Sequence, residues 1–183
     1  MREANLILKV IKERRSVRAY SPEPIPEEDI LKILDAARWA PSAGNLQPWR
    51  FIVVTDSKLK EDIAYAAYGQ LWMATAPVII VVCAVPEESS WRYGERGEKL
   101  YCIQDTAAAI QNILLAAHAL GYGTCWVGAF SEDEVREILN IPKNVRPVAL
   151  ITIGKPAEKP YPPPRRELKE IVYLNRYGQP YIK

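Results

Sequence analysis

The sequence predicts one domain that mixes helices with strands, which places it in the α+β or the α/β class. The stretch 78–85 is almost entirely apolar and rich in β-branched residues, as a strand buried on both faces should be. The stretch 105–120 is alanine-rich and apolar on nearly every side, which is typical of a long buried helix. With 183 residues and no internal repeat, the chain is long enough for one substantial core, so we interpret 1–183 as a single domain.

Helical periodicity and capping signals predict the helices in chain order. Four apolar residues between positions 6 and 11 lie at helical spacing. Pro26 is followed by three acidic residues, which suit the first turn and the positive dipole end of a helix. Ser131 is placed to cap a later helix. The expected helices cover about 5–14, 26–39, 57–67, 105–120 and 132–139.

Apolar runs between these helices predict the strands. They cover about 50–54, 78–85, 124–127 and 148–153, with a last strand at 170–174. The stretch 86–97 is polar and contains glycine, so we interpret it as a surface excursion. The three prolines at 162–164 require an extended backbone late in the chain.

Composition argues against several classes of function. The formal net charge of +2 is too small for a nucleic-acid binder that depends on bulk electrostatics. The three cysteines are widely spaced, so they predict neither a disulfide framework nor a metal site, and they indicate a reducing cytoplasm. We see no signal peptide and no apolar run of about 20 residues, so we expect no membrane span.

The most informative stretch is the loop 41–49, which lies directly ahead of the strand expected at 50–54. Its two prolines bracket small and amide residues, a mixture that suits neither a helix nor a strand interior. Ser42, Asn45 and Gln47 offer short polar groups to a flat ligand that forms hydrogen bonds.

A second unusual element is the stretch 14–18, with arginine at three of its five positions. Arg14 and Arg18 are four residues apart, so they share a face if the first helix extends that far. A basic cluster together with an amide-rich loop suggests a ligand that is anionic at one end and heteroaromatic at the other. Flavin mononucleotide (FMN) fits that description. The alternative is that the basic residues only complement the C-terminal dipole of the helix.

These two elements belong to an ordered set that resembles the flavin-dependent nitroreductase family. The matching stretches are 14–20, 25–26, 36–49, 76–82, 105–112, 121–128 and the late pair Arg165–Arg166. No single stretch is specific by itself, so the resemblance depends on their order and spacing over nearly the whole chain. It implies a nitroreductase-like fold, with a central mixed sheet flanked by helices, in an intertwined homodimer.

The resemblance also implies that FMN is held at the interface between the two subunits. Contacts to the phosphate, the ribityl chain and the pyrimidine edge are assigned to Arg14, Arg15, Ser16 and Arg18. Contacts to the ring from the other subunit are assigned to Pro41, Ser42, Ala43 and Asn45. One late arginine reaches the phosphate, and Arg165 fits the register better than Arg166. The tail over about 155–183 crosses to the partner, or alternatively straps its own subunit.

Two further groups are candidates for the edge of the flavin ring. The amide of Gln70 can pair with the N3 and O4 edge, the alternative being a solvated glutamine. A backbone N–H within Val127, Gly128 and Ala129 can reach N5, because glycine permits close approach. The alternative for that group is an ordinary strand end.

No side chain is expected to act as a catalytic residue, because FMN would carry the chemistry. The single histidine, His118, is interpreted as a packed or interface residue, so no Ser-His-Asp set can be assembled. Without a glycine-rich nucleotide loop, NADH or NADPH would stack on the exposed flavin face, and the acceptor would then use the same place. In the excursion 86–97, Trp91 and Tyr93 are candidates for substrate contact, with a solvated loop as the alternative.

The leading hypothesis is a cytoplasmic, homodimeric FMN-dependent oxidoreductase. It passes hydride from NADH or NADPH to nitroaromatic, quinone or flavin acceptors by a ping-pong mechanism. One alternative keeps the flavin but uses it for another reaction, such as reductive dehalogenation or flavin fragmentation. The other alternative is a flavin-binding protein without useful turnover.

Overall fold

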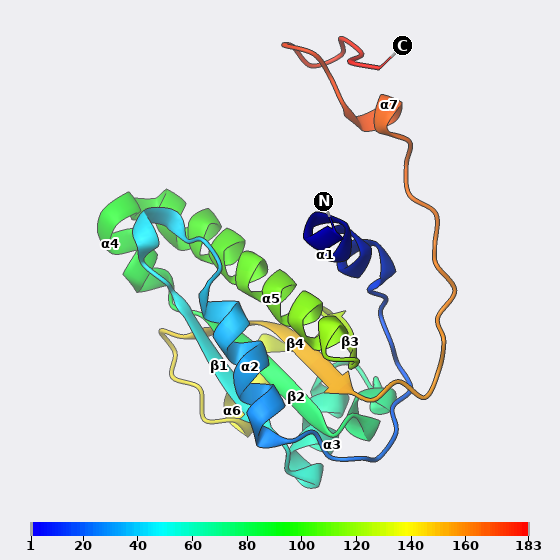
Figure 1. Ribbon diagram of the computed structural model, residues 1–183. Helices are drawn as coiled ribbons and strands as arrows, with labels where there is room; N and C mark the ends of the chain where they lie inside the picture. Colours follow the sequence, from blue (N-terminus) through cyan, green and yellow to red (C-terminus); the bar gives the residue numbers. More distant parts are fainter. Residues whose placement is uncertain (1, 183) are drawn as a thin grey trace.

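The computed structural model describes residues 2–182, and one four-stranded sheet forms its centre (Figure 1). The strands, in the order β1-β2-β4-β3, are β1 (Trp49–Val54), β2 (Val78–Ala84), β4 (Arg146–Gly154) and β3 (Gly123–Val127). All three strand pairings are antiparallel. The parallel pairing that a mixed sheet requires is limited, within the described residues, to one bridge between Ser16 and Thr124.

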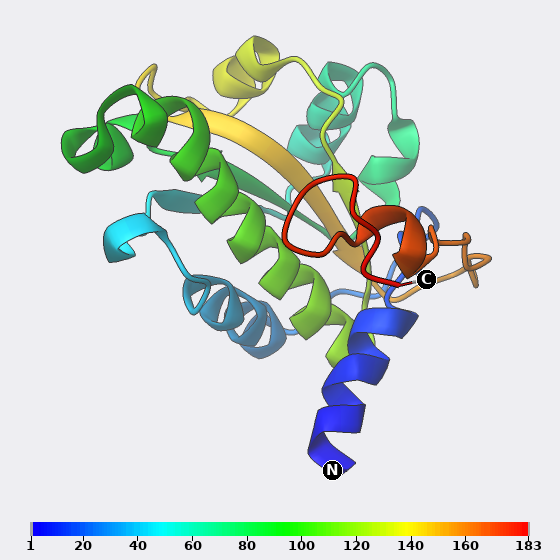
Figure 2. The ribbon, with the colours of Figure 1, turned by 90° about the horizontal axis from the view of Figure 1, so that it is seen from above.

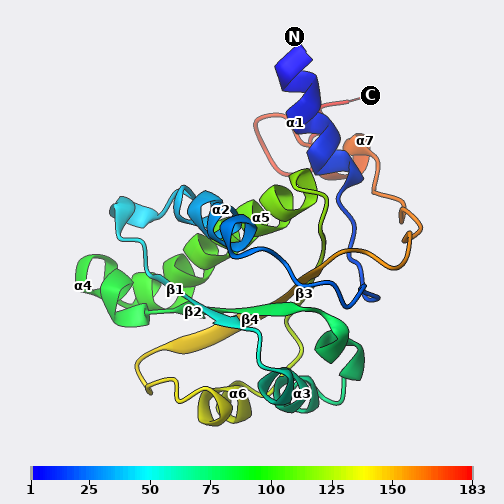
Figure 3. The same ribbon diagram turned by 60° about the horizontal axis from the view of Figure 1, so that its bottom comes forward.

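Helices cover both faces of the sheet, which gives three layers (Figure 3). One face carries α2 (Glu27–Arg38) and α5 (Cys102–Ala119), and the other carries α3 (Ser57–Ala66) and α6 (Glu132–Ile138). Alternate side chains of β2 therefore enter two different cores: Ile80 and Val82 pack with α2 and α5, whereas Ile79 and Val81 pack with α3 and α6. This double burial explains why β2 is apolar at every position.

The helices expected from the sequence are present to within three residues at each end, and α1 (Arg2–Glu13) precedes the layered body. Ser131 caps α6 as predicted, because its hydroxyl accepts the Glu134 N–H at 3.3 Å. Helix α5 runs roughly along the long strand β4 when the molecule is viewed from above (Figure 2). The two ends of this long helix therefore lie over different ends of the sheet.

The stretch 86–97, expected to be a surface excursion, forms a helix, α4 (Pro86–Arg96), which the sequence did not predict, so the alternative of a solvated loop is wrong. Its start carries the signals that identified α2, namely proline in the first turn followed by two acids. Gly94, with φ of 56°, interrupts the helical dihedrals, and a π-helical turn, η3 (Gly97–Tyr101), joins α4 to α5. The polar composition and the internal glycine concealed the helix.

Beyond β4 the chain leaves the sheet as an extended and largely exposed tail (Figure 1). The triproline at 162–164 is extended, as predicted. The strand expected at 170–174 is wrong, because helix α7 (Leu168–Ile171) occupies its start. Tyr173 then forms only an isolated bridge with Pro180.

All three cysteines are buried and unpaired among the described residues. Burial raises the pKa of each thiol, to about 12 for Cys83. None of the helices within 2–182 combines the length and apolar character that crossing a membrane requires.

Candidate functional site

The basic stretch 14–18 is extended rather than helical, because α1 ends at Glu13. It runs beside β3, where Ser16 forms a parallel bridge with Thr124. The Val17 N–H donates to the Thr124 carbonyl at 2.9 Å. Main-chain pairing with the sheet therefore fixes the position of this stretch.

Extended backbone changes which side chains of the stretch share a face. Side chains alternate along it, so Arg14, Ser16 and Arg18 lie on one side, while Val17 is buried on the other. The condition for a shared helical face, that the first helix extends through Arg18, is not met. Arg14 and Arg18 nevertheless lie on the same side, because side chains of an extended backbone return to one side at every second residue.

A cavity of about 250 Å³ opens over this side. Its lining consists of Arg14, Arg15, Ser16, Arg18, Pro160, Tyr161, Pro163 and Arg165. The structure thus brings together all four N-terminal candidates with Arg165 from the tail. Arg166 is not among the lining residues.

The Arg18 main-chain N–H donates to the Glu158 carboxylate, but the guanidinium groups of this cavity have no carboxylate partner among the described residues. No salt bridge among the described residues joins Arg14, Arg15 or Arg165 to an acid. The pKa of Arg14 is lowered by burial, and then by the positive charges of Arg15 and Arg165. Converging cations that disfavour one another fit a ligand with a doubly charged group such as a phosphate, which guanidinium donors bind well.

Arg15 and Arg18 have different surroundings within this cluster. The Arg15 guanidinium donates to the carbonyls of Lys12 and Arg14, at 2.6 and 2.7 Å, and so complements the C-terminal end of α1. The Arg18 guanidinium lies 5.8 Å from the ring centroid of Trp72, in the 3-10 helix η2 (Leu71–Thr75). Arg15 therefore takes, at least in part, the dipole role that the sequence left open.

Gln70 and the end of β3 lie together. The Gln70 Nε2 donates to the carbonyls of Ala67 and Ala129, at 2.9 and 3.1 Å. Both amide N–H groups are thus occupied, which leaves Oε1 as an acceptor. Val127 is buried, whereas Gly128 and Ala129 are exposed.

The loop 41–47 is a tight turn with an unusual backbone. It contains the 3-10 helix η1 (Ala43–Asn45), and φ is 58° at Gly44, 57° at Asn45 and 53° at Gln47. The Ser42 hydroxyl accepts the Gln47 N–H at 3.0 Å. Pro41, Gly44 and Asn45 are exposed, so the outer surface of the loop is open to a neighbour.

The loop and the basic stretch lie at opposite ends of α5 (Figures 1 and 3). Asp105, near the start of α5, accepts the Ala43 N–H, whereas His118, near its end, lines a cavity together with Arg15. Thirteen helical residues span roughly 20 Å. Within one chain the structure therefore does not bring the loop residues together with the arginines.

Helix α4 packs beside the loop. A Cβ added at Gly44 would lie 2.7 Å from the Tyr93 Oη and 3.0 Å from the Arg92 Nη1. Trp91 points to solvent, with 82% of its surface exposed. The two candidates for substrate contact thus lie at the loop end of the molecule, with Tyr93 against the loop and Trp91 free.

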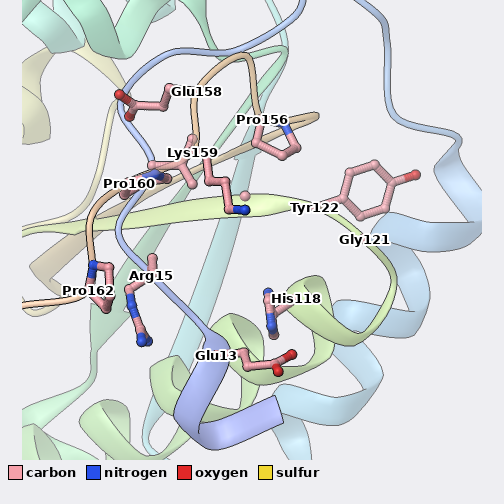
Figure 4. A pocket seen from close by; sticks show the side chains of 12 residues that line it. Glu13, Arg15, His118, Gly121, Tyr122, Pro156, Glu158, Lys159, Pro160 and Pro162 are labelled. Carbon is pink, nitrogen blue, oxygen red and sulfur yellow. The ribbon is translucent and has the colours of Figure 1, made fainter. Parts of the chain in front are cut away.

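A second cavity, of about 570 Å³, lies between the ends of α1 and α5 and the tail (Figure 4). Glu13, Lys159 and His118 extend into the space between these segments. Burial lowers the pKa of His118, and the negative charge of Glu13 acts in the opposite direction. The sequence did not predict this cavity, because the tail segment that forms one wall is far away along the chain.

Sequence reasoning also missed two residues of the site. Tyr161 lines the basic cavity, and only the fold places it there. Asp105 holds the loop, and a signal for it was available: it is the one carboxylate in helix α5.

Comparison with known proteins identifies the fold and the family. The model of the Nitroreductase family matches residues 11–72 and 64–155. A nitroreductase family protein of Clostridium novyi NT, solved as a crystal structure, has a TM-score of 0.75 and 37% identity, and the match covers 96% of each chain.

Two curated relatives agree with this family match. A protein of Archaeoglobus fulgidus, provisionally named NADH dehydrogenase/NAD(P)H nitroreductase, is 43% identical over 83% of this chain and 86% of its own length. The FMN reductase [NAD(P)H] of Bacillus subtilis is 30% identical over 94% of this chain and 75% of its own length. On these matches, the chain belongs to the nitroreductase family.

Proposed function

We propose that the chain is an FMN-dependent oxidoreductase that passes hydride from NADH or NADPH to nitroaromatic, quinone or flavin acceptors. The family match, and relatives named as NAD(P)H nitroreductase and FMN reductase, support FMN as cofactor and NAD(P)H as donor. The cavity of unpaired arginines is the single observation that carries the assignment of the site. Bound FMN supplies the redox chemistry, so this chain's residues bind and orient it.

The basic cavity is the proposed site for the anionic end of FMN. Arg14, Ser16 and Arg165 hold the phosphate, with Arg15 and Arg18 beside it. The side-chain oxygen of Gln70, Oε1, accepts a hydrogen bond from the N3 edge of the ring. The backbone over 127–129 faces the ring edge that contains N5. Positive charge near the pyrimidine edge stabilises negative charge there and raises the reduction potential.

The ring end of the site comes from a second copy of the chain in this proposal. Pro41, Ser42, Ala43 and Asn45 lie too far from the arginines of their own chain to share one ligand with them. Apolar side chains are left exposed on α1 and on the tail, which supports a dimer in which the tail crosses to the partner. They include Leu6, Ile7, Ile11, Leu168, Ile171, Leu174 and Tyr177.

In this proposal, one face of the bound flavin is open to solvent and to substrates, and the kinetic mechanism follows from that. Solvent supplies the protons, so no side chain acts as an acid or base. Donor and acceptor occupy the same place in turn, which gives ping-pong kinetics. Trp91 and Tyr93 contact the acceptor, and the protein works in the cytoplasm as one domain per subunit.

An anaerobic absorbance titration of the FMN-loaded protein by NADH, and then by NADPH, tests this proposal. We expect the flavin band to bleach and to return when a nitroaromatic or a quinone is added. A bound flavin that neither nucleotide reduces would favour the non-catalytic alternative. Failure to bind FMN at all would overturn the site.

A further inference from the structure

The loop 41–47 has left-handed backbone at three positions, of which Gly44 and Asn45 are residue types that adopt it readily. The left-handed dihedrals at Gln47 are costly for a longer side chain, and they persist only where surrounding contacts impose them. Contacts within the loop, such as Ser42 with Gln47, fix its shape. They do not fix where the loop lies relative to the body of the protein.

Among the described residues, one side-chain hydrogen bond ties the loop to the body. The Ala43 N–H donates to the Asp105 Oδ1 at 3.0 Å, across 62 residues of sequence. Asp105 lies in the first turn of α5 and is 7% exposed. The contact therefore joins the loop to the longest helix of the core.

A carboxylate at position 105 lowers the folding stability of the protein. Its second oxygen, Oδ2, is buried and has no hydrogen-bond partner among the described residues. A buried carboxylate with half of its acceptor capacity unused costs stability, only part of which the positive end of α5 offsets. Burial accordingly raises the pKa of this carboxyl. A role in stability alone does not account for it.

Helix α4 holds the loop from its other side. Arg92 and Tyr93 contact Gly44 so closely that a side chain there would overlap them. The loop is thus placed between α5 and α4. Among the described residues of α4 and α5, Asp105 alone forms a hydrogen bond with the main chain of the loop.

We propose that Asp105 is a positioning residue for flavin binding, which sets the place of the loop 41–47 through its hydrogen bond to the Ala43 N–H. This inference rests on the proposed function, in which the loop covers the flavin ring. Asp105 does not touch the ligand, so its influence is confined to the ring end. The arginine cavity, at the far end of α5, is independent of it.

The test compares two ligands that differ only at the phosphate end, FMN and riboflavin, in fluorescence titrations of the full chain. Asp105→Ala should weaken both ligands by the same factor, about tenfold, which is the usual effect of losing one hydrogen bond to a charged group. Asp105→Asn keeps an acceptor oxygen and should bind both like the wild type. The matched control, Arg14→Ala, should weaken FMN but leave riboflavin unchanged.

A second variant removes the donor instead of the acceptor. Ala43→Pro lacks the N–H, and the backbone accepts proline there, since Ser42 is extended (ψ 151°) and position 43 begins a 3-10 helix. It should weaken both ligands as Asp105→Ala does. It should add little in the Asp105→Ala background, because both changes remove the same bond.

Three results would overturn the inference. In the first, the ligand-free Asp105→Ala variant melts at a lower temperature than the wild type but binds both flavins as well as the wild type does. That result would show that Asp105 has a purely structural role. In the second, Asp105→Asn loses as much affinity as Asp105→Ala. The third result applies if Asp105→Ala does not fold. In that case, an Ala43→Pro variant that binds FMN and riboflavin like the wild type would overturn the inference. A wild-type chain that binds no FMN overturns the proposed function as well, whereas these three results leave it standing.

Discussion

The two ends of the proposed flavin site are held in place by different means. The stretch 14–18 is fixed by main-chain pairing with β3, which leaves its side chains free to face a ligand. The loop 41–47 has a left-handed backbone at three positions and depends on one buried carboxylate and on α4. The phosphate end should therefore respond to changes of charge, and the ring end to changes of shape.

The largest expected effect removes the charges of the phosphate end. The double variant Arg14→Ala, Arg165→Ala should weaken FMN at least ~100-fold, because each charge-assisted hydrogen bond contributes about 1.5–3 kcal/mol. Fluorescence titration measures the affinity. The matched control is Arg166→Ala, which changes a neighbouring arginine outside the cavity and should bind FMN like the wild type. Equal losses in both variants would contradict the placement of Arg165.

The next effect tests the shape of the ring end. Gly44→Ala should lower the free energy of unfolding by roughly 1–2 kcal/mol, because it places a side chain at a left-handed position and the ends of the Tyr93 and Arg92 side chains must move aside. Gly69→Ala is the control, since Gly69 also has positive φ but no atom within 4 Å of an added Cβ. That variant should lose about 1 kcal/mol. Urea denaturation gives both values, and equal losses would show that α4 does not press on the loop.

A smaller effect comes from the charge beneath the loop. Burial raises the pKa of Asp105, so between the ordinary carboxyl range and that raised value the folded protein binds more protons than the unfolded chain. Wild-type stability therefore falls as pH rises through this window. Asp105→Asn has no such loss of stability and should therefore be more stable than the wild type at pH 7. Denaturation at several pH values should show the difference shrinking toward about pH 4, and a constant difference would contradict the ionised state.

The smallest effect separates two adjacent arginines. Arg15→Ala should weaken FMN by less than about threefold and lower stability by about 0.5 kcal/mol, because its guanidinium already complements α1. The same titration and denaturation experiments measure both quantities. A loss as large as that of Arg14→Ala would place Arg15 on the phosphate instead.

The sequence predicted the sheet and its covering helices because their signals are local. Alternation, apolar runs and capping residues such as Ser131 act within a few positions of the chain. The errors lie where tertiary contacts decide. Extended backbone at 14–18 depends on pairing with β3, and α4 tolerates Gly94 because the chain turns there into α5.

The candidate site was predictable in its residue types but not in its arrangement. Arginines and an amide-rich loop indicate an anionic and heteroaromatic ligand by their chemistry alone. The separation of the two groups by the length of α5, and the contributions of Tyr161 and Asp105, depend on how distant segments meet. Short-range sequence patterns contain no information on tertiary contacts between distant segments.

The buried cysteines have a consequence for the chemistry that this protein handles. Quinones, proposed here as acceptors, are electrophiles that alkylate thiolates. A thiol with a pKa of about 12, as at Cys83, is ionised in roughly one molecule in 10⁵ at pH 7. The thiols of Cys102 and Cys125 are also buried with raised pKa values. The chain therefore offers its own reactive acceptors almost no nucleophilic sulfur, and an enzyme built this way resists inactivation by them.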